Sequence, residues 1–274
     1  MKKFLKVLFP TALLFTLMAC GKSANVDNND VIDDIDDIDG TTDSFTVTTD
    51  VENGYTVSNN IYTFTAPGEY TLHGELNGQI LVDAGDDDKV ELTLNGVNIY
   101  SDDNSPIYCY NADSVKIKAK SDTENIITDK RSAKITDSDS QGEGAINAKC
   151  DLALQGSGVL QVVGNYNNGV HTTKDLTLKN LSLKSTAVNN ALKGKDSIKI
   201  ESGTIIAIST TGNGVKTDNT DASKKGVQRG SFTMTGGALK IQAADDGIDA
   251  AFDANISDGT IAIYTGSCSD YTKT

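Results

Sequence analysis

Carboxylates gather near the C-terminal end of the chain, where Asp245, Asp246 and Asp249 fall within five residues. Carboxylate oxygens are the usual protein ligands of calcium, which takes roughly six to eight oxygens. The same short frame occurs upstream with amides or lysine in these places, as Asn167-Asn168-Gly169-Val170-His171, Asn189-Asn190-Ala191-Leu192-Lys193 and Gly212-Asn213-Gly214-Val215-Lys216. The repeated frame therefore predicts a repeated fold, and its last copy predicts a cation site.

Short strands must position these frames, because apolar residues alternate with polar ones and show no convincing helical period. An apolar marker follows the Gly, Ala or Pro of each frame, at Ile107, Ile146, Val170, Leu192, Val215 and Ile248. The markers are 39, 24, 22, 23 and 33 residues apart, so a unit of about 23 residues repeats, with loops inserted within 121–143 and 219–228. With three short strands in each unit, this period predicts an all-β parallel β-helix, and a β-sandwich is the alternative.

Stacked units place equivalent residues in columns about 4.8 Å apart. The residues before the markers are expected to form an asparagine ladder of Asn168, Asn190, Asn213 and Asp246. The same alignment predicts a Ca²⁺ site with the ligands Asp218, Asp245, Asp246 and Asp249. The alternative is that Asp246 only continues the ladder and the other carboxylates are solvated.

A basic column is expected on the same outer face as the carboxylates. It consists of His171, Lys193, Lys195 and Lys216. A flat, charged face beside a divalent ion suits an extended acidic polymer such as a uronate chain, and these four residues are predicted to bind it. The alternative is charge pairing between neighbouring units, Lys195 with Asp218 and Lys216 with Asp249, which contributes little stability at a surface.

The N-terminus begins Met1-Lys2-Lys3 and continues as an apolar run to Leu17-Met18-Ala19-Cys20, which resembles the lipobox of bacterial lipoproteins. The prediction is a signal peptide over 1–19, a lipidated Cys20 opening an acidic disordered tether over 20–44, and a folded domain over 45–274. The chain is then extracytoplasmic, lipid-anchored to a bacterial membrane and exposed at the cell surface. A net charge of −14 argues against nucleic acid as a partner. Cys109 falls at an inward strand position, which favours a buried thiol over a disulfide with Cys150.

Several segments resemble a bacterial surface family, the carbohydrate-binding domain-containing β-helix lipoproteins, over roughly residues 45–264. They are Gly68-Glu69-Tyr70-Thr71-Leu72-His73-Gly74-Glu75-Leu76, Gly85-Asp86-Asp87-Asp88-Lys89-Val90, Leu94-Asn95-Gly96-Val97-Asn98-Ile99 and Asp245-Asp246-Gly247-Ile248-Asp249-Ala250. The family is related to the calcium-dependent pectate lyases of polysaccharide lyase family nine. The resemblance implies a right-handed parallel β-helix (solenoid) that binds calcium and plant-type polysaccharide. In the related lyases an Asp-Asp-x-x-Asp run holds a catalytic calcium, and Asp245, Asp246 and Asp249 match that run.

Three functions follow, in order of preference. The first is a surface-anchored, calcium-dependent protein that binds acidic or plant cell-wall polysaccharide, polygalacturonate-like or a β-glucan, as a monomer. The second is a pectate-lyase-like polysaccharide lyase with Lys216 as base, although the neighbouring carboxylates favour the protonated ammonium. The third is a structural adhesin whose ions only stabilise the fold. Whether the chain is an enzyme stays open, and binding is favoured.

Overall fold

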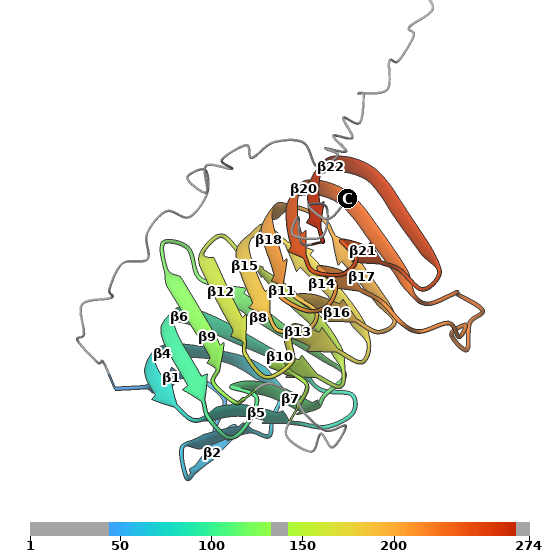
Figure 1. Cartoon of the computed structure of the whole chain (residues 1–274). Helices are drawn as coiled ribbons and strands as arrows, with labels where there is room; N and C mark the ends of the chain where they lie inside the picture. Colours follow the sequence, from blue (N-terminus) through green and yellow to red (C-terminus); the bar gives the residue numbers. More distant parts are fainter. Residues whose placement is uncertain (1–43, 133–141, 267–274) are drawn as a thin grey trace, which may run out of the picture.

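The computed structural model describes residues 44–132 and 142–266, which form 22 β-strands in two sheets (Figure 1). The predicted signal peptide, the lipidation site Cys20 and nearly all of the predicted tether lie outside the described residues. Within these residues, no helix has the length and apolar character needed to cross a membrane. The prediction of an all-β protein is confirmed.

Ten parallel strands close into a barrel, with strand order β6-β8-β11-β14-β17-β20-β18-β15-β12-β9 and a final pairing of β9 with β6. Along the barrel, equivalent strands of successive repeats lie side by side, for example Val159–Gly164 beside Leu181–Ala187. The barrel strands are β6 (Lys89–Ser101), β8 (Ser114–Ala119), β9 (Glu124–Asp129), β11 (Asp151–Gly156), β12 (Val159–Gly164), β14 (Asp175–Lys179), β15 (Leu181–Ala187), β17 (Ser197–Ile200), β18 (Gly203–Ser209) and β20 (Ser231–Ala243). The same hydrogen-bonded network also contains β1 (Thr46–Thr48), β4 (Gly68–Asn77) and β22 (Asp253–Thr265).

A second sheet of nine strands, here called the open sheet, takes one strand from each repeat (Figure 1). Its strands are β2 (Tyr55–Ser58), β3 (Ile61–Phe64), β5 (Gln79–Asp83), β7 (Ile107–Asn111), β10 (Gly144–Ala148), β13 (Asn168–Thr172), β16 (Leu192–Gly194), β19 (Val215–Lys216) and β21 (Ile248–Asp249). All its pairings are parallel except that of β2 with β3.

The predicted right-handed parallel β-helix (solenoid) with three short strands per rung is wrong, because the barrel is closed. Two long strands close it. In β6, Lys89–Leu94 pair with β8 and Asn98–Ser101 pair with β9. In β20, the first half pairs with β17 and the second half with β18. Each of these two strands therefore continues round a corner, whereas three short strands per repeat would require a turn between separate strands at that point. Gly96 and Gly237, at φ of 73° and 87°, supply the bends.

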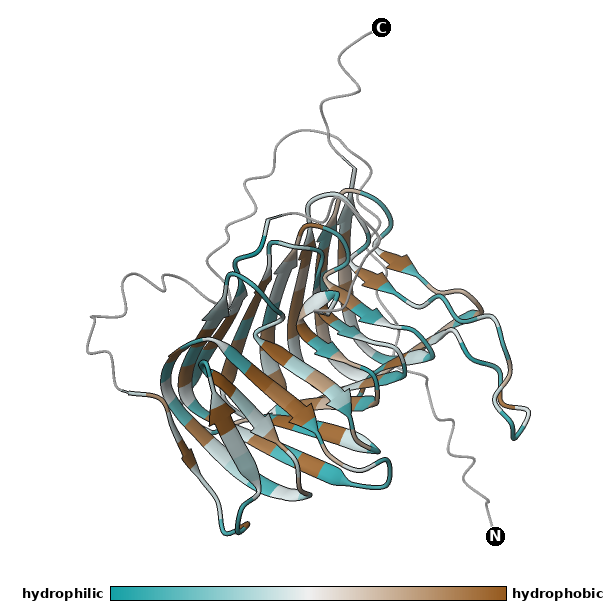
Figure 2. Ribbon diagram, turned by 90° about the horizontal axis from the view of Figure 1, so that it is seen from below, coloured by the Kyte–Doolittle hydropathy of each residue, from teal (hydrophilic) through white to brown (hydrophobic). Residues whose placement is uncertain are grey.

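The repeat register is confirmed within the open sheet. The markers Ile107, Ile146, Val170, Leu192, Val215 and Ile248 pair directly with one another in that order. All but Ile248 are fully buried, and together with the inward residues of the barrel they form one continuous core. Figure 2 shows the resulting alternation of hydrophobic and hydrophilic residues along the strands. The predicted buried thiol is also confirmed, since Cys109 and Cys150 are buried free cysteines. Burial raises the pKa of the Cys150 thiol to about 12.

The asparagine ladder is present at the corner before the open sheet. The Nδ2 groups of Asn190 and Asn213 each donate to the amide oxygen one repeat earlier, at 2.9 and 3.2 Å. The backbone N–H of Asp246 continues the ladder by donating to Asn213 Oδ1 at 2.9 Å. The alternative interpretation of Asp246 is therefore correct in this respect. The ladder fixes the start of each open-sheet strand, and so it positions the outward residues that follow.

Candidate functional site

Two rows of outward residues run along the open sheet, one residue and three residues after each marker. The first outer row is Tyr108, Asn147, His171, Lys193, Lys216 and Asp249, which pair strand to strand. The second outer row is Tyr110, Lys149, Thr173, Lys195 and Asp218, aligned by backbone hydrogen bonds such as Lys149 N–H to Cys109 O and Thr173 N–H to Ala148 O. All four predicted substrate-binding residues lie in these rows, as the sequence alignment placed them.

The C-terminal half of the first outer row consists of ion pairs. Lys193 Nζ lies 2.9 Å from Asp218 Oδ2, and the two side chains are 18% and 34% exposed. Lys216 pairs with Asp249, and these side chains are 27% and 33% exposed. The predicted Lys216–Asp249 pair is thus present, whereas Asp218 pairs with Lys193 across a diagonal and not with Lys195. Each pair offers both a hydrogen-bond donor and an acceptor at the surface.

The four carboxylates predicted to bind calcium are not brought together around one position. Asp245 and Asp246 are exposed in the turn before β21, while Asp218 and Asp249 accept from lysines. Over residues 44–132 and 142–266, no group of three or more His, Cys, Asp or Glu side chains is arranged to hold a metal ion. The donor set as it stands does not fit calcium, and calcium binding by this chain stays a prediction.

The second outer row is the exposed cationic part of the sheet. Lys149 and Lys195 are exposed, and neither forms an ion pair within the described part of the chain. Lys149 Nζ lies 4.2 Å from the centroid of the Tyr110 ring, which is itself 49% exposed and packs edge-on against Tyr108. Lys149, two residues past Asn147, was expected on the face of the basic column but was not assigned to the substrate-binding set. Tyr110, two residues past Tyr108, was not among the predicted site residues.

A hollow of ≈ 570 Å³ adjoins the second outer row, with Lys149 in its wall. The hairpin at 219–229 contributes to the lining, and Arg229 Nε lies 3.1 Å from the buried Asp196 carboxylate. The lining also contains the carboxylates Asp113, Asp151 and Asp175. Burial, with smaller effects from neighbouring carboxylates, raises the pKa of Asp151. The hollow is therefore lined by both hydrogen-bond acceptors and cationic side chains.

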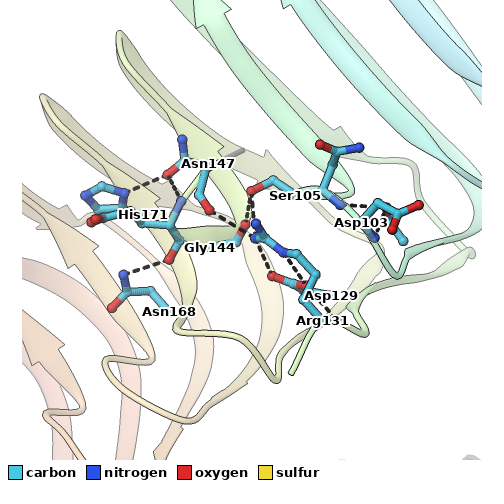
Figure 3. A network of polar contacts seen from close by, with 12 residues as sticks. Asp103, Ser105, Asp129, Arg131, Gly144, Asn147, Asn168 and His171 are labelled. Carbon is cyan, nitrogen blue, oxygen red and sulfur yellow. Dashed lines mark hydrogen bonds and ion pairs between the residues drawn. The ribbon is translucent and has the colours of Figure 1, made fainter. Parts of the chain in front are cut away.

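The N-terminal half of the first outer row is buried in a polar network (Figure 3). His171 is only 5% exposed, and its Nδ1 donates to Asn147 Oδ1 at 2.7 Å. The backbone N–H of Glu143 donates to the same oxygen at 3.1 Å. His171 occupies its predicted column, but its side chain is buried and is not presented to a ligand on the outer face of the sheet. Burial of an outward residue carries no signal in the local sequence.

The network ends in a buried ion pair between Arg131 and Asp129. Arg131 Nε and Nη2 donate to the two carboxylate oxygens at 2.9 and 2.7 Å, and Nη2 also donates to Gly142 O at 3.0 Å. The guanidinium lies 3.9 Å from the centroid of the Tyr166 ring. Burial raises the pKa of Asp129, and the contacts with Arg131 oppose that rise. The network ties residues 129–131 to residues 142–144, so it holds both ends of the predicted first loop.

Fold and site together define a class: an all-β repeat protein whose open sheet carries parallel rows of polar and cationic side chains on its outer face. Comparison with known proteins gives the family. The chain belongs to the carbohydrate-binding domain-containing protein family, whose model matches residues 58–274. A carbohydrate-binding domain-containing protein of Acetivibrio thermocellus is 34% identical over 224 residues, covering 80% of this chain and 76% of the relative.

A solved structure is similar as well. It is the polysaccharide lyase-like protein from C. thermocellum, described as a gadolinium derivative, with 32% sequence identity and a TM-score of 0.67. The match covers 80% of this chain and 90% of that one. The resemblance to the carbohydrate-binding family is therefore confirmed.

Proposed function

We propose that the chain binds an acidic polysaccharide along the second outer row. The observation that carries the proposal is the pair of exposed lysines, Lys149 and Lys195, which stand in register without a carboxylate partner among the described residues. Two strand steps separate them, about 9.6 Å at the usual strand spacing. That separation is comparable with the repeat of an extended disaccharide, so carboxylates on alternate sugars would meet successive lysines.

Aromatic and paired side chains complete the binding surface. The exposed face of Tyr110 offers a platform for the apolar side of a sugar ring. The Lys193–Asp218 pair and the adjoining hollow offer donors and acceptors for hydroxyl groups. Elsewhere the chain repels polyanions, since its net charge is −14. The exposed lysines of the second outer row offer an acidic polymer local positive charge on this otherwise acidic chain.

Calorimetric titration of polygalacturonate tests the proposal. Wild type is expected to give saturable heat, and the double variant K149A/K195A is expected to bind about tenfold or more weakly, since each lost contact is worth about 1 kcal/mol. Lys184→Ala is the matched control, because Lys184 lies on β15 of the barrel and away from the open sheet. Equal loss in the control and the double variant, or no loss in either, would remove the second outer row from consideration. Absence of heat in wild type would leave the structural adhesin or a neutral β-glucan.

Calcium dependence is a second proposal, tested in the same titration with calcium and then with chelator. Its support is chemical: the solved relative is a gadolinium derivative, and gadolinium, like calcium, is a hard cation that prefers oxygen ligands. In this chain the ion would have to draw Asp218 and Asp249 away from their lysines. Asp249→Ala should abolish any calcium-dependent heat. Identical isotherms in calcium and in chelator would contradict the proposal.

Polysaccharide lyase activity is the alternative function, because the solved relative is a polysaccharide lyase-like protein. Abstraction of a proton from the uronate requires an unprotonated base. The Lys216 ammonium is engaged in an ion pair with the Asp249 carboxylate and is not held as an isolated base. We therefore place binding before catalysis. Steady formation of unsaturated product, abolished in Lys216→Ala, would reverse that order.

Attachment to the cell surface rests on the N-terminal sequence alone. A lipid on Cys20 would hold the binding domain outside the cytoplasm, where polysaccharide occurs. Metabolic labelling with a radioactive fatty acid is expected to mark the wild-type chain and to leave Cys20→Ala unlabelled. Labelling of both would show that the lipid is elsewhere.

A further inference from the structure

The terminal strands at the two ends of the molecule are paired differently. At the N-terminal end, β1 pairs with β4 in antiparallel fashion and β2 folds back on β3 (Figure 1). The rings of Tyr55, Tyr62 and Phe64 pack together there. At the C-terminal end, β22 pairs only with β20 and β21 pairs only with β19. Within the described part of the chain, the other edge of both strands has no partner. Such edges present unpaired N–H and C=O groups that template an added strand.

Apolar side chains at this end are incompletely covered. Phe252, Ile263 and Tyr264 are 60%, 41% and 42% exposed. Ile248 and Ile256 face the core, yet they are only partly buried. The same inward columns are fully buried one strand earlier, at Val215 and Met234. A further strand added beside β22 would therefore complete the burial of these apolar side chains.

Charge gives this end a definite sign. Residues 241–266 contain no Lys, Arg or His, and they include the five carboxylates Asp245, Asp246, Asp249, Asp253 and Asp258. Asp249 pairs with Lys216. The other four form no ion pair with any described residue. A second copy joined end to end through a two-fold axis would set these carboxylates against their equivalents, and like charges brought together are unfavourable.

We propose that the C-terminal end is an interaction surface for a partner protein that adds an extended segment to β22. The segment it fits alternates apolar and basic residues. Its backbone pairs with the free edge of β22, its apolar side chains cover Ile256 and Ile263, and its Lys or Arg residues meet Asp253 and Asp258. This surface is separate from the second outer row, so polysaccharide binding and partner binding are independent.

The probe is a labelled synthetic peptide of alternating valine and lysine, matched to the 13 residues of β22. Fluorescence anisotropy with the full chain is expected to show saturable binding that weakens with salt. A peptide of alternating valine and glutamate is expected not to bind. D253N/D258N should bind the valine–lysine peptide severalfold more weakly, whereas K149A/K195A, the polysaccharide variant, should bind it as wild type does.

Hydrogen exchange locates the contact. Peptide binding is expected to protect amides of β22 and to leave β1 and β2 unchanged. Protection elsewhere, or equal affinity for the lysine and glutamate peptides, would overturn the proposal. A concentration-dependent dimer that buries β22 and excludes the peptide would also overturn it in favour of a second copy. A variant pair with Asp50→Asn and Glu52→Gln at the N-terminal end controls for net charge.

Discussion

The two halves of the first outer row occupy equivalent places in the repeat but have different surroundings. In the first half, Asn147 and His171 are buried and hydrogen-bonded to each other, in a network that extends to Arg131 and Asp129. In the second half, Lys193 and Lys216 sit in partly exposed ion pairs. Buried polar groups must keep their partners, whereas surface pairs exchange them at little cost. The first half of the first outer row therefore maintains the structure, whereas its second half and the exposed lysines of the second outer row are open to a ligand.

Arg131→Met should give the largest effect on stability. It leaves the Asp129 carboxylate buried without its cation, which costs about 3–5 kcal/mol in the free energy of unfolding. Urea unfolding at neutral pH measures the loss. A loss below about 1 kcal/mol would show that the first half is no more structural than the second.

The pH dependence of this variant has a definite sign. The pKa of Asp129 is raised in the folded protein, so the folded state holds this proton more tightly than the unfolded state. The contribution of Asp129 to stability therefore falls as pH rises from the unfolded pKa through the folded one. Removing Arg131 raises the folded pKa further, which widens that window. The deficit of Arg131→Met relative to wild type should shrink as pH falls toward the acid range, and a deficit independent of pH would contradict the assignment.

Asn190→Ala should have an intermediate effect, because Asn190 joins the two halves in the asparagine ladder. Its side-chain oxygen accepts from both the backbone and the side-chain nitrogens of Asn213, at 3.2 Å each. The variant leaves these buried donors without a partner, at a cost of about 1–3 kcal/mol. Asn190→Asp keeps the acceptor oxygens and is the matched comparison. Equal destabilisation by both variants would mean that packing, and not the accepted hydrogen bonds, sets the cost.

Lys193→Met should change stability least. Its pair with Asp218 is partly exposed, so the free energy of unfolding should fall by less than about 1 kcal/mol. A double-mutant cycle with Asp218→Asn isolates the coupling between the two side chains. Coupling as large as the loss in Arg131→Met would erase the difference between the halves.

The sequence predicted best what depends on a fixed period. Spacings of 22 to 24 residues between markers set the register of the open sheet, so the columns from Ile146 to Val215 and the ladder from Asn168 to Asn213 were correct. Closure of the barrel was missed because Gly96 and Gly237 lie inside long bent strands, and a glycine in an alternating stretch indicates a turn just as well.

The positions of the site residues on the sheet were predicted better than the side-chain contacts that they make. The outward columns containing Lys193, Lys195 and Lys216 followed from the register. The register did not predict that Asp218 pairs with Lys193 and not with Lys195. A long flexible lysine side chain reaches a diagonal neighbour as easily as a direct one. Burial of His171 was missed because its neighbours are distant in sequence, such as Asn147. Among the described residues the predicted calcium ligands are dispersed, because Asp218 and Asp249 pair with lysines, and the short acidic motif contained no signal for those contacts.

We infer that the exposed lysines of the second outer row recognise charge on a polysaccharide. The most direct measurement compares wild-type affinity for oligogalacturonates with affinity for the same oligosaccharides after methyl esterification of their carboxyl groups. Esterification is expected to weaken binding about tenfold or more, because two lysine–carboxylate contacts are lost. Equal affinity for the charged and the esterified sugars would contradict it and would assign recognition to the neutral ring.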